Sequence, residues 1–370
     1  MIDSLHIAGF KLFRDLTIPK LGRMNLFVGE NNTGKSCLLE AIGLYAGKNP
    51  IGDLLQTAAL RTGEPLRPWE ADGWNEEGAA VRHPVFELFH QAVSGGGNLD
   101  SSEFLIERIG DSSPLRVEYQ LLEVTIKEDG SRQYHPTRSG EIVFGAMERA
   151  FFVYRGNKQV AQFSRQILLL TSPMLDLERV PLNGVPFVPH VPANGFPDWK
   201  AASLWDALIQ GPGQEQVLRW MRMIDSRIEN LDYIAGRQNS RIALLKVEGQ
   251  GRIPLRSMGD GLRRMFHIGL AMPTASKGIL LIDEFENGLH WRVQRELWAA
   301  LAKAAQEFDV QIFATTHSRD CIGGFVSASQ ELGIKDAKLY RMERDGDEIY
   351  AVDLALINVE AALELNGEVR

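Results

Sequence analysis

The chain has 370 residues, of which 44% are hydrophobic and 24% charged, an ordinary balance for a soluble globular protein of two domains or one large elaborated domain. The formal net charge of −8 argues against a protein coated in basic surface, although a local basic groove stays compatible with it. Two cysteines, no apolar run of about 18 residues and no signal peptide argue against a disulfide scaffold and a membrane span, so we expect a cytoplasmic protein.

The first 48 residues predict two strands and a helix. Residues 4–13 alternate apolar and polar side chains and predict a strand, and residues 24–29 predict a short apolar strand that runs into a glycine-rich loop. Residues 35–47 predict a helix that ends at Gly47. Its apolar face carries Leu38, Leu39, Ile42 and Tyr45.

The middle of the chain changes character. Residues from about 50 to 150 combine Gly and Pro clusters with strand-like runs such as 116–128, which predicts a mostly β lobe with an irregular insertion. Residues 181–197 are too rich in proline for a helix or a central strand, so we expect an ordered loop. Two helices are expected around 200–210 and 214–228.

The last third predicts alternating strands and helices. Two buried strands are expected at 278–284 and 310–317, with an amphipathic helix at 290–308 between them. Its apolar stripe carries Val293, Leu297, Leu301 and Phe308. Residues 338–354 predict a hairpin that turns at Asp345-Gly346. The sequence shows no internal repeat and no sustained heptads.

The glycine-rich stretch GENNTGKS, residues 29–36, has the spacing of a phosphate-binding loop between a strand and a helix. Gly29 and Gly34 let backbone N–H groups approach phosphate oxygens, Lys35 supplies a charge for the β- and γ-phosphates, and Ser36 offers a hydroxyl to Mg²⁺. The alternative is a glycine-rich turn that binds nothing, which the flanking strand and helix disfavour. The residues expected to bind the nucleotide here are Gly29, Glu30, Asn31, Asn32, Thr33, Gly34, Lys35, Ser36 and Cys37.

An apolar strand at 279–282 ends in two adjacent carboxylates. Asp283 is suited to the Mg²⁺ shell, and Glu284 to polarising the attacking water as a general base. The same pattern also occurs as an ordinary strand-to-helix cap, an alternative that the phosphate loop makes less favourable. Glu286 is open between a helix-start acid and a partner of the catalytic groups.

A second apolar strand ends in Thr316 and His317. A single histidine is more often structural than catalytic, but this one lies where a γ-phosphate contact is expected, so we assign it a catalytic role. Ser318 and Asp320 are suited to capping the next helix.

The stretch RSMGDGLRR, residues 256–264, precedes an apolar helix and lies about 25 residues before the acidic pair. Small residues at a helix N-terminus can form an anion site, for which the candidates are Ser257, Gly259 and Gly261. The alternative is a helix cap with a flexible turn.

These four elements, in this order, resemble the ABC-type ATPases of the SMC/RecF group. LLIDEFENGLH, FATTHSRDCI and the late GDEIYAVDL look like the ATPase module of the OLD-like AAA-family proteins, and so does the N-terminal stretch through residue 42. The resemblance is strong over 1–48 and 228–355, the expected core lobes, and weak over 49–200, the expected β-rich insertion. It implies one ABC-type P-loop ATPase domain over 1–370, of α/β class, with a mixed β lobe and an α/β lobe.

The resemblance also implies ATP and Mg²⁺ as ligands and a homodimer that sandwiches ATP, with a higher oligomer left open. Ser257 and Gly259 would approach the γ-phosphate held by the other subunit, ENGLH would be the D-loop at the dimer seam, and His317 the switch histidine. A Q-loop glutamine is expected, and no context singles out one candidate among Gln133, Gln159, Gln162 and Gln166.

Three departures from the group affect the expected function. The signature is not LSGGQ, and the roughly 220 residues between Ser36 and Ser257 contain no coiled coil, so long-armed tethering is not expected. The chain also leaves no room after His317 for the Toprim nuclease domain of full OLD proteins. We therefore expect a separate effector protein, with a nuclease as one candidate.

The favoured function is an Mg²⁺-dependent ATPase whose dimer controls that effector in anti-phage defence or DNA maintenance. Four arginines near the signature could face DNA, although a solvated or dimer-facing surface is the favoured interpretation: Arg252, Arg256, Arg263 and Arg264. The alternative function is a nucleotide-binding scaffold or regulator with negligible turnover. A transporter subunit is less favoured, because it needs a coupling surface for a membrane partner and the signature and ENGLH do not look like one. A small-molecule kinase is less favoured still, because the signature-like stretch and the switch histidine would then have no role.

Overall fold

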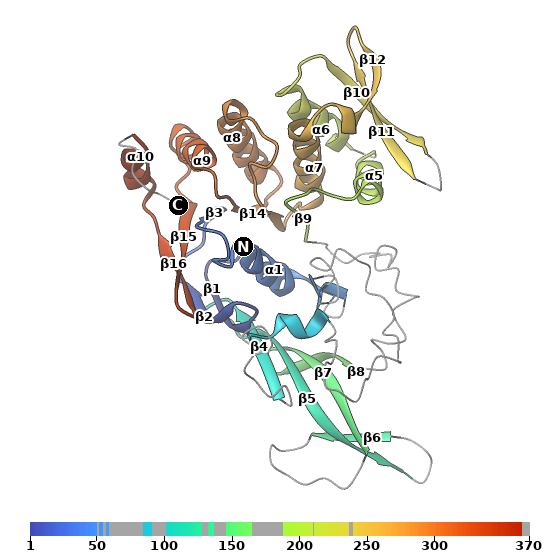
Figure 1. Ribbon diagram of the computed structural model, residues 1–370, viewed down its shortest axis with the longest axis vertical. Coiled ribbons are helices and arrows are strands. Elements are labelled where there is room, and N and C mark those ends of the chain that lie inside the picture. The colour runs from blue at the N-terminus through green and yellow to red at the C-terminus, as the bar shows by residue number, and fades with distance from the viewer. Residues whose placement is uncertain are drawn as a thin grey trace.

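The computed structural model describes residues 1–49, 52–54, 57–58, 84–90, 101–127, 132–136, 146–164, 188–209, 211–236 and 240–364. The described residues form an α/β lobe, an antiparallel β lobe and a small three-stranded sheet (Figure 1). Most of the expected irregular insertion, the first part of the proline-rich stretch and Gln166 lie outside the described residues.

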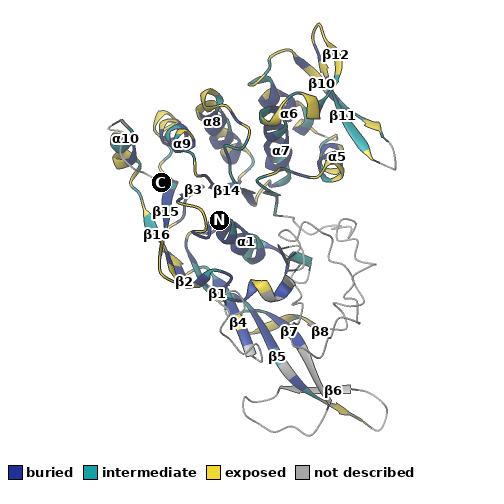
Figure 2. Ribbon diagram, in the orientation of Figure 1, coloured by how far each residue is buried: buried dark blue, intermediate teal, exposed yellow. Residues whose placement is uncertain are grey.

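A six-stranded sheet forms the centre of the α/β lobe, in the order β16-β15-β3-β14-β13-β9. All neighbours in it are parallel except the β15–β16 hairpin. Every residue of the central strands β3, β13 and β14 is buried, as expected for parallel strands covered on both faces (Figure 2). The strands are β3 (Met24–Val28), β9 (His190–Val191), β13 (Ile279–Ile282), β14 (Gln311–Thr315), β15 (Ala337–Asp345) and β16 (Glu348–Asp353).

Helices cover both faces of this sheet. Alternate residues of β13 belong to different hydrophobic clusters: Leu281 packs in the cluster that contains α1, and Leu280 packs in the cluster that contains α7, α8 and α9. The helix α1 therefore lies on one face and the other three on the opposite face (Figure 1). The helices are α1 (Lys35–Ala46), α5 (Asp198–Ala207), α6 (Gly213–Arg222), α7 (Asp260–Thr274), α8 (Trp291–Glu307), α9 (Arg319–Glu331) and α10 (Leu356–Glu364).

The helix α8 contributes a buried aromatic residue outside the predicted stripe. Leu297 and Leu301 are buried as expected, whereas Val293 and Phe308 are only partly buried. Trp298 is fully buried, stacks on the ring of Phe285 with centroids 3.9 Å apart, and also meets Phe325 edge to face. Such an aromatic cluster fixes the helix firmly beside the segment that follows β13.

The β lobe is an antiparallel sheet in the order β2-β1-β4-β5-β7-β8, with β6 paired to β5. It confirms the β-rich character predicted for the middle of the chain. The segment 4–13, predicted as one strand, instead turns at Lys11 and Leu12 into a second strand. The elements are β1 (Leu5–Phe10), β2 (Phe13–Ile18), β4 (Ser101–Glu107), β5 (Leu115–Ile126), β6 (Arg132–Pro136), β7 (Ala146–Arg155), β8 (Lys158–Ser164) and the 3₁₀ turn η1 (Pro84–Leu88).

The β1–β2 turn carries a buried ion pair. Lys11 Nζ lies 2.5 Å from Glu40 Oε2 of α1, and the side chains are only 4% and 6% exposed. The Lys11 backbone donates to Leu88 O, and His90 Nδ1 lies 2.8 Å from Lys11 O. The turn therefore connects the β lobe to the helix that follows the glycine-rich loop.

A three-stranded antiparallel sheet, which the sequence did not reveal, precedes the signature-like stretch. Its strands are β10 (Ile228–Ala235), β11 (Arg241–Val247) and β12 (Gly251–Pro254), followed by the 3₁₀ turn η2 (Leu255–Ser257). Only two of the eight residues of β10 are buried, so the hydrophobic alternation that marks a half-buried strand is weak.

The helices expected at 200–210 and 214–228 are confirmed as α5 and α6, but α6 ends early, at Arg222. The C-terminal hairpin turns over Gly346-Asp347, because Asp345 pairs with Glu348. The proline-rich stretch is not wholly a loop, since His190 and Val191 form the edge strand β9. In the ranges that the structure describes, no helix is long and apolar enough to cross a membrane.

Candidate functional site

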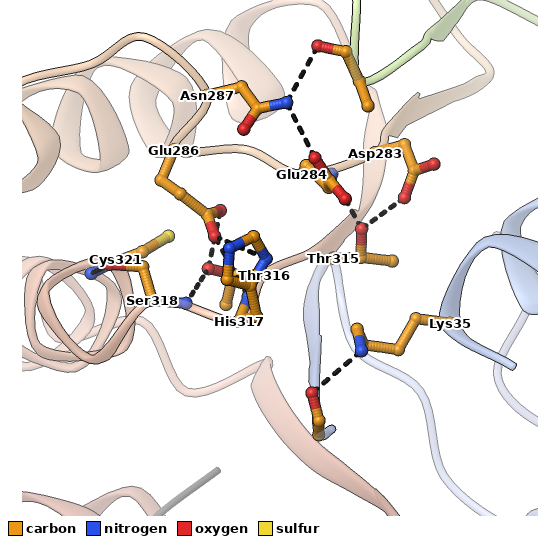
Figure 3. A network of polar contacts seen from close by, with 12 residues as sticks. Lys35, Asp283, Glu284, Glu286, Asn287, Thr315, Thr316, His317, Ser318 and Cys321 are labelled. Carbon is orange, nitrogen blue, oxygen red and sulfur yellow. Dashed lines mark hydrogen bonds and ion pairs between the residues drawn. The ribbon is translucent and has the colours of Figure 1, made fainter. Parts of the chain in front are cut away.

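The glycine-rich loop, the acidic pair and the threonine-histidine segment follow β3, β13 and β14. These strands are parallel neighbours, so their carboxyl ends lie at one edge of the sheet. Figure 3 shows the resulting cluster of polar side chains, in which Lys35 from α1 faces the two strand ends. The three elements that the sequence marked separately therefore form one site.

Sterics require glycine at both ends of the loop. Gly29 has φ +141° and Gly34 has φ +86°, conformations that favour glycine. A Cβ atom on Gly34 would lie 2.8 Å from Cε1 of Phe13, and one on Gly29 would lie 2.5 Å from the carbonyl oxygen of Met342. The loop leads directly into α1, the arrangement that presents backbone N–H groups to an anion.

Lys35 lies at the first position of α1 with its side chain folded back over the loop. Its Nζ donates to the carbonyl oxygens of Gly29 at 2.8 Å and Glu30 at 2.6 Å. Burial lowers the pKa of Lys35, while the charges of the nearby carboxylates oppose this effect. The ammonium group is thus held at the loop by weak carbonyl acceptors, which phosphate oxygens could replace.

Ser36 and Asp283 meet at the proposed metal position. Ser36 Oγ donates to Asp283 Oδ1 at 3.1 Å, and Thr315 Oγ1 donates to the same oxygen at 2.6 Å. Mg²⁺ prefers oxygen ligands and is usually held by one or two carboxylates together with substrate phosphates. A hydroxyl and a carboxylate beside a phosphate loop fit that preference.

Glu284 has an unusual backbone and a fixed side chain. Its φ is +48°, a conformation that costs energy for a residue other than glycine and is concentrated at functional sites. The backbone N–H donates to Thr315 Oγ1 at 2.8 Å, and Asn287 Nδ2 donates to the carboxylate at 2.7 Å. One hydroxyl group, that of Thr315, therefore joins both acids of the pair.

Glu286 holds the segment after β14. Its carboxylate accepts from Thr316 Oγ1 at 2.6 Å and from the backbone N–H of His317 at 3.0 Å, and it lies 3.2 Å from His317 Nδ1. The structure resolves the open choice for Glu286: it is a partner of this segment, because α8 starts only at Trp291. Ser318 caps α9 as predicted, accepting from the N–H of Cys321.

The signature-like stretch forms the turn before α7. Gly259 caps this helix with φ +89°, and no heavy atom of the described residues beyond its chain neighbours lies within 4 Å of the position its Cβ would occupy. A Cβ on Gly261 would lie 2.5 Å from the carbonyl oxygen of Gly288, so the stretch touches ENGLH closely. The helices that follow the phosphate loop and the signature, α1 and α7, cover opposite faces of the sheet.

The four arginines do not form one basic surface. Arg264 is 3% exposed, and its guanidinium donates to the backbone carbonyls of Asp283 and Glu284. Burial lowers the pKa of Arg264 to about 10, which leaves it charged near neutral pH. Arg252 is paired with Asp232, and Arg263 is paired with Asp260. A DNA-facing role for Arg264 is therefore wrong, because its side chain is buried and binds the backbone of Asp283 and Glu284.

The described glutamine candidates for the Q-loop lie in the β lobe. Gln133 is in β6, and Gln159 and Gln162 are in β8. At the site itself, β9 runs parallel beside β13 and ends at the same sheet edge. His190 of β9 has its Nε2 buried without a hydrogen-bond partner in the described structure, and burial lowers its pKa. A two-residue strand in a proline-rich segment gives no periodicity from which this position could be found.

This fold and this set of strand ends are those of a P-loop ATPase domain. More particularly, the chain belongs to the family described as "AAA domain, putative AbiEii toxin, Type IV TA system", whose model matches residues 24–320. The chain is also similar to an "ATP/GTP phosphatase" of Helicobacter pylori, at 23% identity over 347 residues, covering 87% of this chain and 86% of the relative.

Solved structures support the fold. The chain resembles an SMC head bound to the C-winged helix domain of ScpA, with a TM-score of 0.53 at 14% identity, covering 98% of this chain and 99% of the other. It also resembles a Pyrococcus furiosus Smc head bound to the C-terminal domain of ScpA, with a TM-score of 0.52 at 12% identity and 99% coverage of both. The resemblance to ABC-type heads is thereby confirmed for the architecture.

Proposed function

We propose that the protein is an Mg²⁺-dependent ATP hydrolase in which two copies close on ATP and report the closed state to a separate effector. The main support is that four side chains lie together at one sheet edge: Lys35, Ser36, Asp283 and Glu284. The hydroxyl group of Thr315 hydrogen-bonds to both acidic residues. Family membership and the likeness to SMC heads support this function.

The residues have distinct proposed roles. The N–H groups of the loop and Lys35 bind the β- and γ-phosphates, while Ser36 and Asp283 hold Mg²⁺, which supplies charge neutralisation on the phosphate oxygens. Glu284 polarises the attacking water, and Asn287 keeps its carboxylate in place. His317, positioned by Glu286, contacts the γ-phosphate.

Completion of the site by a second copy is supported by the exposed signature. Gly259 and its neighbourhood are open to solvent, and α7 lies on the face of the sheet opposite α1. Small residues at the N-terminus of a 15-residue helix suit a γ-phosphate delivered by another subunit. Ser257, Gly259 and Gly261 are accordingly proposed to bind ATP held on the partner copy.

Mixing two defective variants tests this composite site. Lys35→Ala removes the phosphate lysine and Ser257→Arg blocks the signature, so each variant alone should lose most turnover. In an equal mixture half of the dimers are mixed, and each has one intact site of two, so turnover should recover to about a quarter of wild type.

Steady-state phosphate release, measured on each variant and on the mixture, is the readout. A mixture as inactive as its components would mean that each chain completes its own site. A signature variant that keeps full activity alone would exclude Ser257 from the reaction.

Thr315 provides a second test within the site. Thr315→Val keeps the shape of the side chain but leaves the N–H of Glu284 without its acceptor and Asp283 with only the Ser36 hydroxyl of its two donors. If the loss of these hydrogen bonds raises the barrier by about 1–3 kcal/mol, kcat should fall by about five- to 150-fold. Thr315→Ser, which keeps the hydroxyl, should retain most activity in the same assay, and equal activity of the two variants would remove Thr315 from the mechanism.

The biological setting belongs to the proposal as well. The family description names a putative toxin of a Type IV TA system, which supports a role in anti-phage defence more than one in DNA maintenance. SMC heads are seen with a partner protein, which supports a separate effector here. We place the protein in the cytoplasm, and OLD-like ATPases remain the proposed functional model.

A further inference from the structure

A polar pocket of about 270 Å³ lies where three segments meet on the side of α7. These segments are the loop after β9, the first turns of α7, and Asn287-Gly288. Its polar lining consists of Asn194, Asp260, Arg263, Arg264, His267 and Asn287. Ser257, Gly259 and Gly261, which are proposed to bind the partner's ATP, do not line the pocket, but Asp260 and Arg263 of the same stretch do, so the pocket adjoins that surface.

Close backbone packing builds the walls. A Cβ on Gly195 would lie 2.1 Å from His267 Nδ1, and one on Gly288 would lie 2.7 Å from Cβ of Asp260. The three segments therefore meet at distances that only glycine allows. The volume is slightly below the range of about 300–1,000 Å³ for small-molecule sites, which suits a compact ligand.

The lining favours an anion. Phe196 N–H donates to His267 Nδ1 at 3.1 Å, and burial lowers the pKa of His267 to about 3, so the imidazole is neutral. The charged lining residues are two arginines and one aspartate, and this Asp260 is 79% exposed and pairs with Arg263 at 3.3 Å. An ion pair this exposed contributes little to stability, so a ligand could displace Asp260 as the partner of Arg263.

A second observation is that one N–H group of Arg264 lacks a hydrogen-bond acceptor in the described structure. The side chain is 97% buried and lines the pocket, and its two terminal nitrogens donate to backbone carbonyls. Its Nε has no hydrogen-bond partner in the part of the chain that the structure describes. A buried N–H of a charged group left unpaired is costly, so Arg264 lacks, beside this pocket, one of the acceptors that a buried guanidinium usually has.

We propose that this pocket binds a small phosphate-bearing ligand, either inorganic phosphate or a compact phosphomonoester. Arginine and amide donors approach it from three segments, which suits the several oxygens of a tetrahedral phosphate. Arg263 is the accessible cationic contact, the buried charge of Arg264 lies in the pocket wall, and the side-chain amides of Asn194 and Asn287 are the neutral contacts.

The ligand would act on hydrolysis through Asn287. This amide donates both to Ala193 O at 3.1 Å and to Glu284 Oε2 at 2.7 Å, so it joins the pocket wall to the proposed catalytic acid. A phosphate that engages Asn287 draws it from Glu284 and lowers turnover. This second step rests on the proposed function, whereas binding itself does not.

Binding is tested by calorimetric titration of the full chain saturated with ADP and Mg²⁺, which keeps the phosphate loop filled. Inorganic phosphate and glycerol 3-phosphate are titrated separately into wild type, Arg263→Gln and Asn194→Ala. We expect saturable binding that weakens about tenfold or more in Arg263→Gln, because a charge-assisted hydrogen bond is lost. Arg252→Gln, which alters an arginine on β12 outside the pocket, is the matched control and should bind like wild type.

Tighter binding of glycerol 3-phosphate would identify a phosphomonoester ligand, and equal or tighter binding of phosphate would identify the free ion. No saturable binding of either, or equal loss in Arg263→Gln and Arg252→Gln, would overturn the proposal. Binding without any effect on turnover would leave the site intact and refute only the coupling through Asn287. If the wild-type protein binds phosphate in the pocket but does not hydrolyse ATP, the proposed function is refuted and the binding site is not.

Discussion

Replacing Glu284 with glutamine should lower ATP turnover by about 10²–10⁴-fold, the usual contribution of a positioned general base. The change is small in shape, and the new amide oxygen can still accept from Asn287 Nδ2, which lies 2.7 Å from the carboxylate. Lys35, Ser36 and Asp283 are untouched, so ATP affinity should stay near wild type. The variant should therefore accumulate as an ATP-bound dimer.

Single-turnover hydrolysis, nucleotide binding and light scattering measure these three properties on one preparation. Glu229→Gln is the matched control, because that glutamate forms an exposed pair with Lys246 on the three-stranded sheet. Equal, background-level hydrolysis in wild type and Glu284→Gln would contradict the proposed ATPase activity and support a nucleotide-binding scaffold.

Replacing Lys11 with methionine should reduce the free energy of unfolding by about 3–5 kcal/mol, because it leaves the buried Glu40 carboxylate without its cation. Methionine keeps the length of the side chain, and both residues bear the same backbone cost at φ +47°. The effect is large because the pair is almost completely removed from water, with the two side chains 4% and 6% exposed.

Urea denaturation followed by circular dichroism gives the measurement. Lys246→Met, which breaks a pair whose side chains are 56% and 43% exposed, should cost less than about 1 kcal/mol. The double variant Lys11→Met/Glu40→Gln should recover part of the loss, since it also removes the negative charge of the buried Glu40 side chain. A loss below about 1 kcal/mol for Lys11→Met alone would show that the pair is not important for stability.

The sequence predicted the parts of the site that lie at the ends of apolar strands. Gly29, Asp283 and His317 each follow a short run of buried residues, and parallel strands necessarily bring such ends together. The α/β class and the β-rich middle followed from the same periodicities. Glu286 was a candidate from the sequence, but only the structure shows that it binds the segment after β14 and does not start a helix.

The missed residues act through contacts distant in sequence. Thr315 resembles any buried strand residue until its hydroxyl is seen between Asp283 and Glu284. Arg264 sits in a run of basic residues that suggests a surface, and only tertiary packing shows it buried. The two residues of β9 are too few for any pattern. Composition and periodicity do not encode such three-dimensional neighbours.

The placement of α1 and α7 on opposite faces of one sheet has a consequence for control in the cell. A single copy can hold ATP in its loop, but in the proposed mechanism the group that completes the reaction is on another molecule. Activity then rises with roughly the square of concentration while dimers are scarce. In that mechanism, doubling the amount of protein raises the ATPase activity about fourfold, so the amount that a cell makes controls the activity more steeply than in proportion.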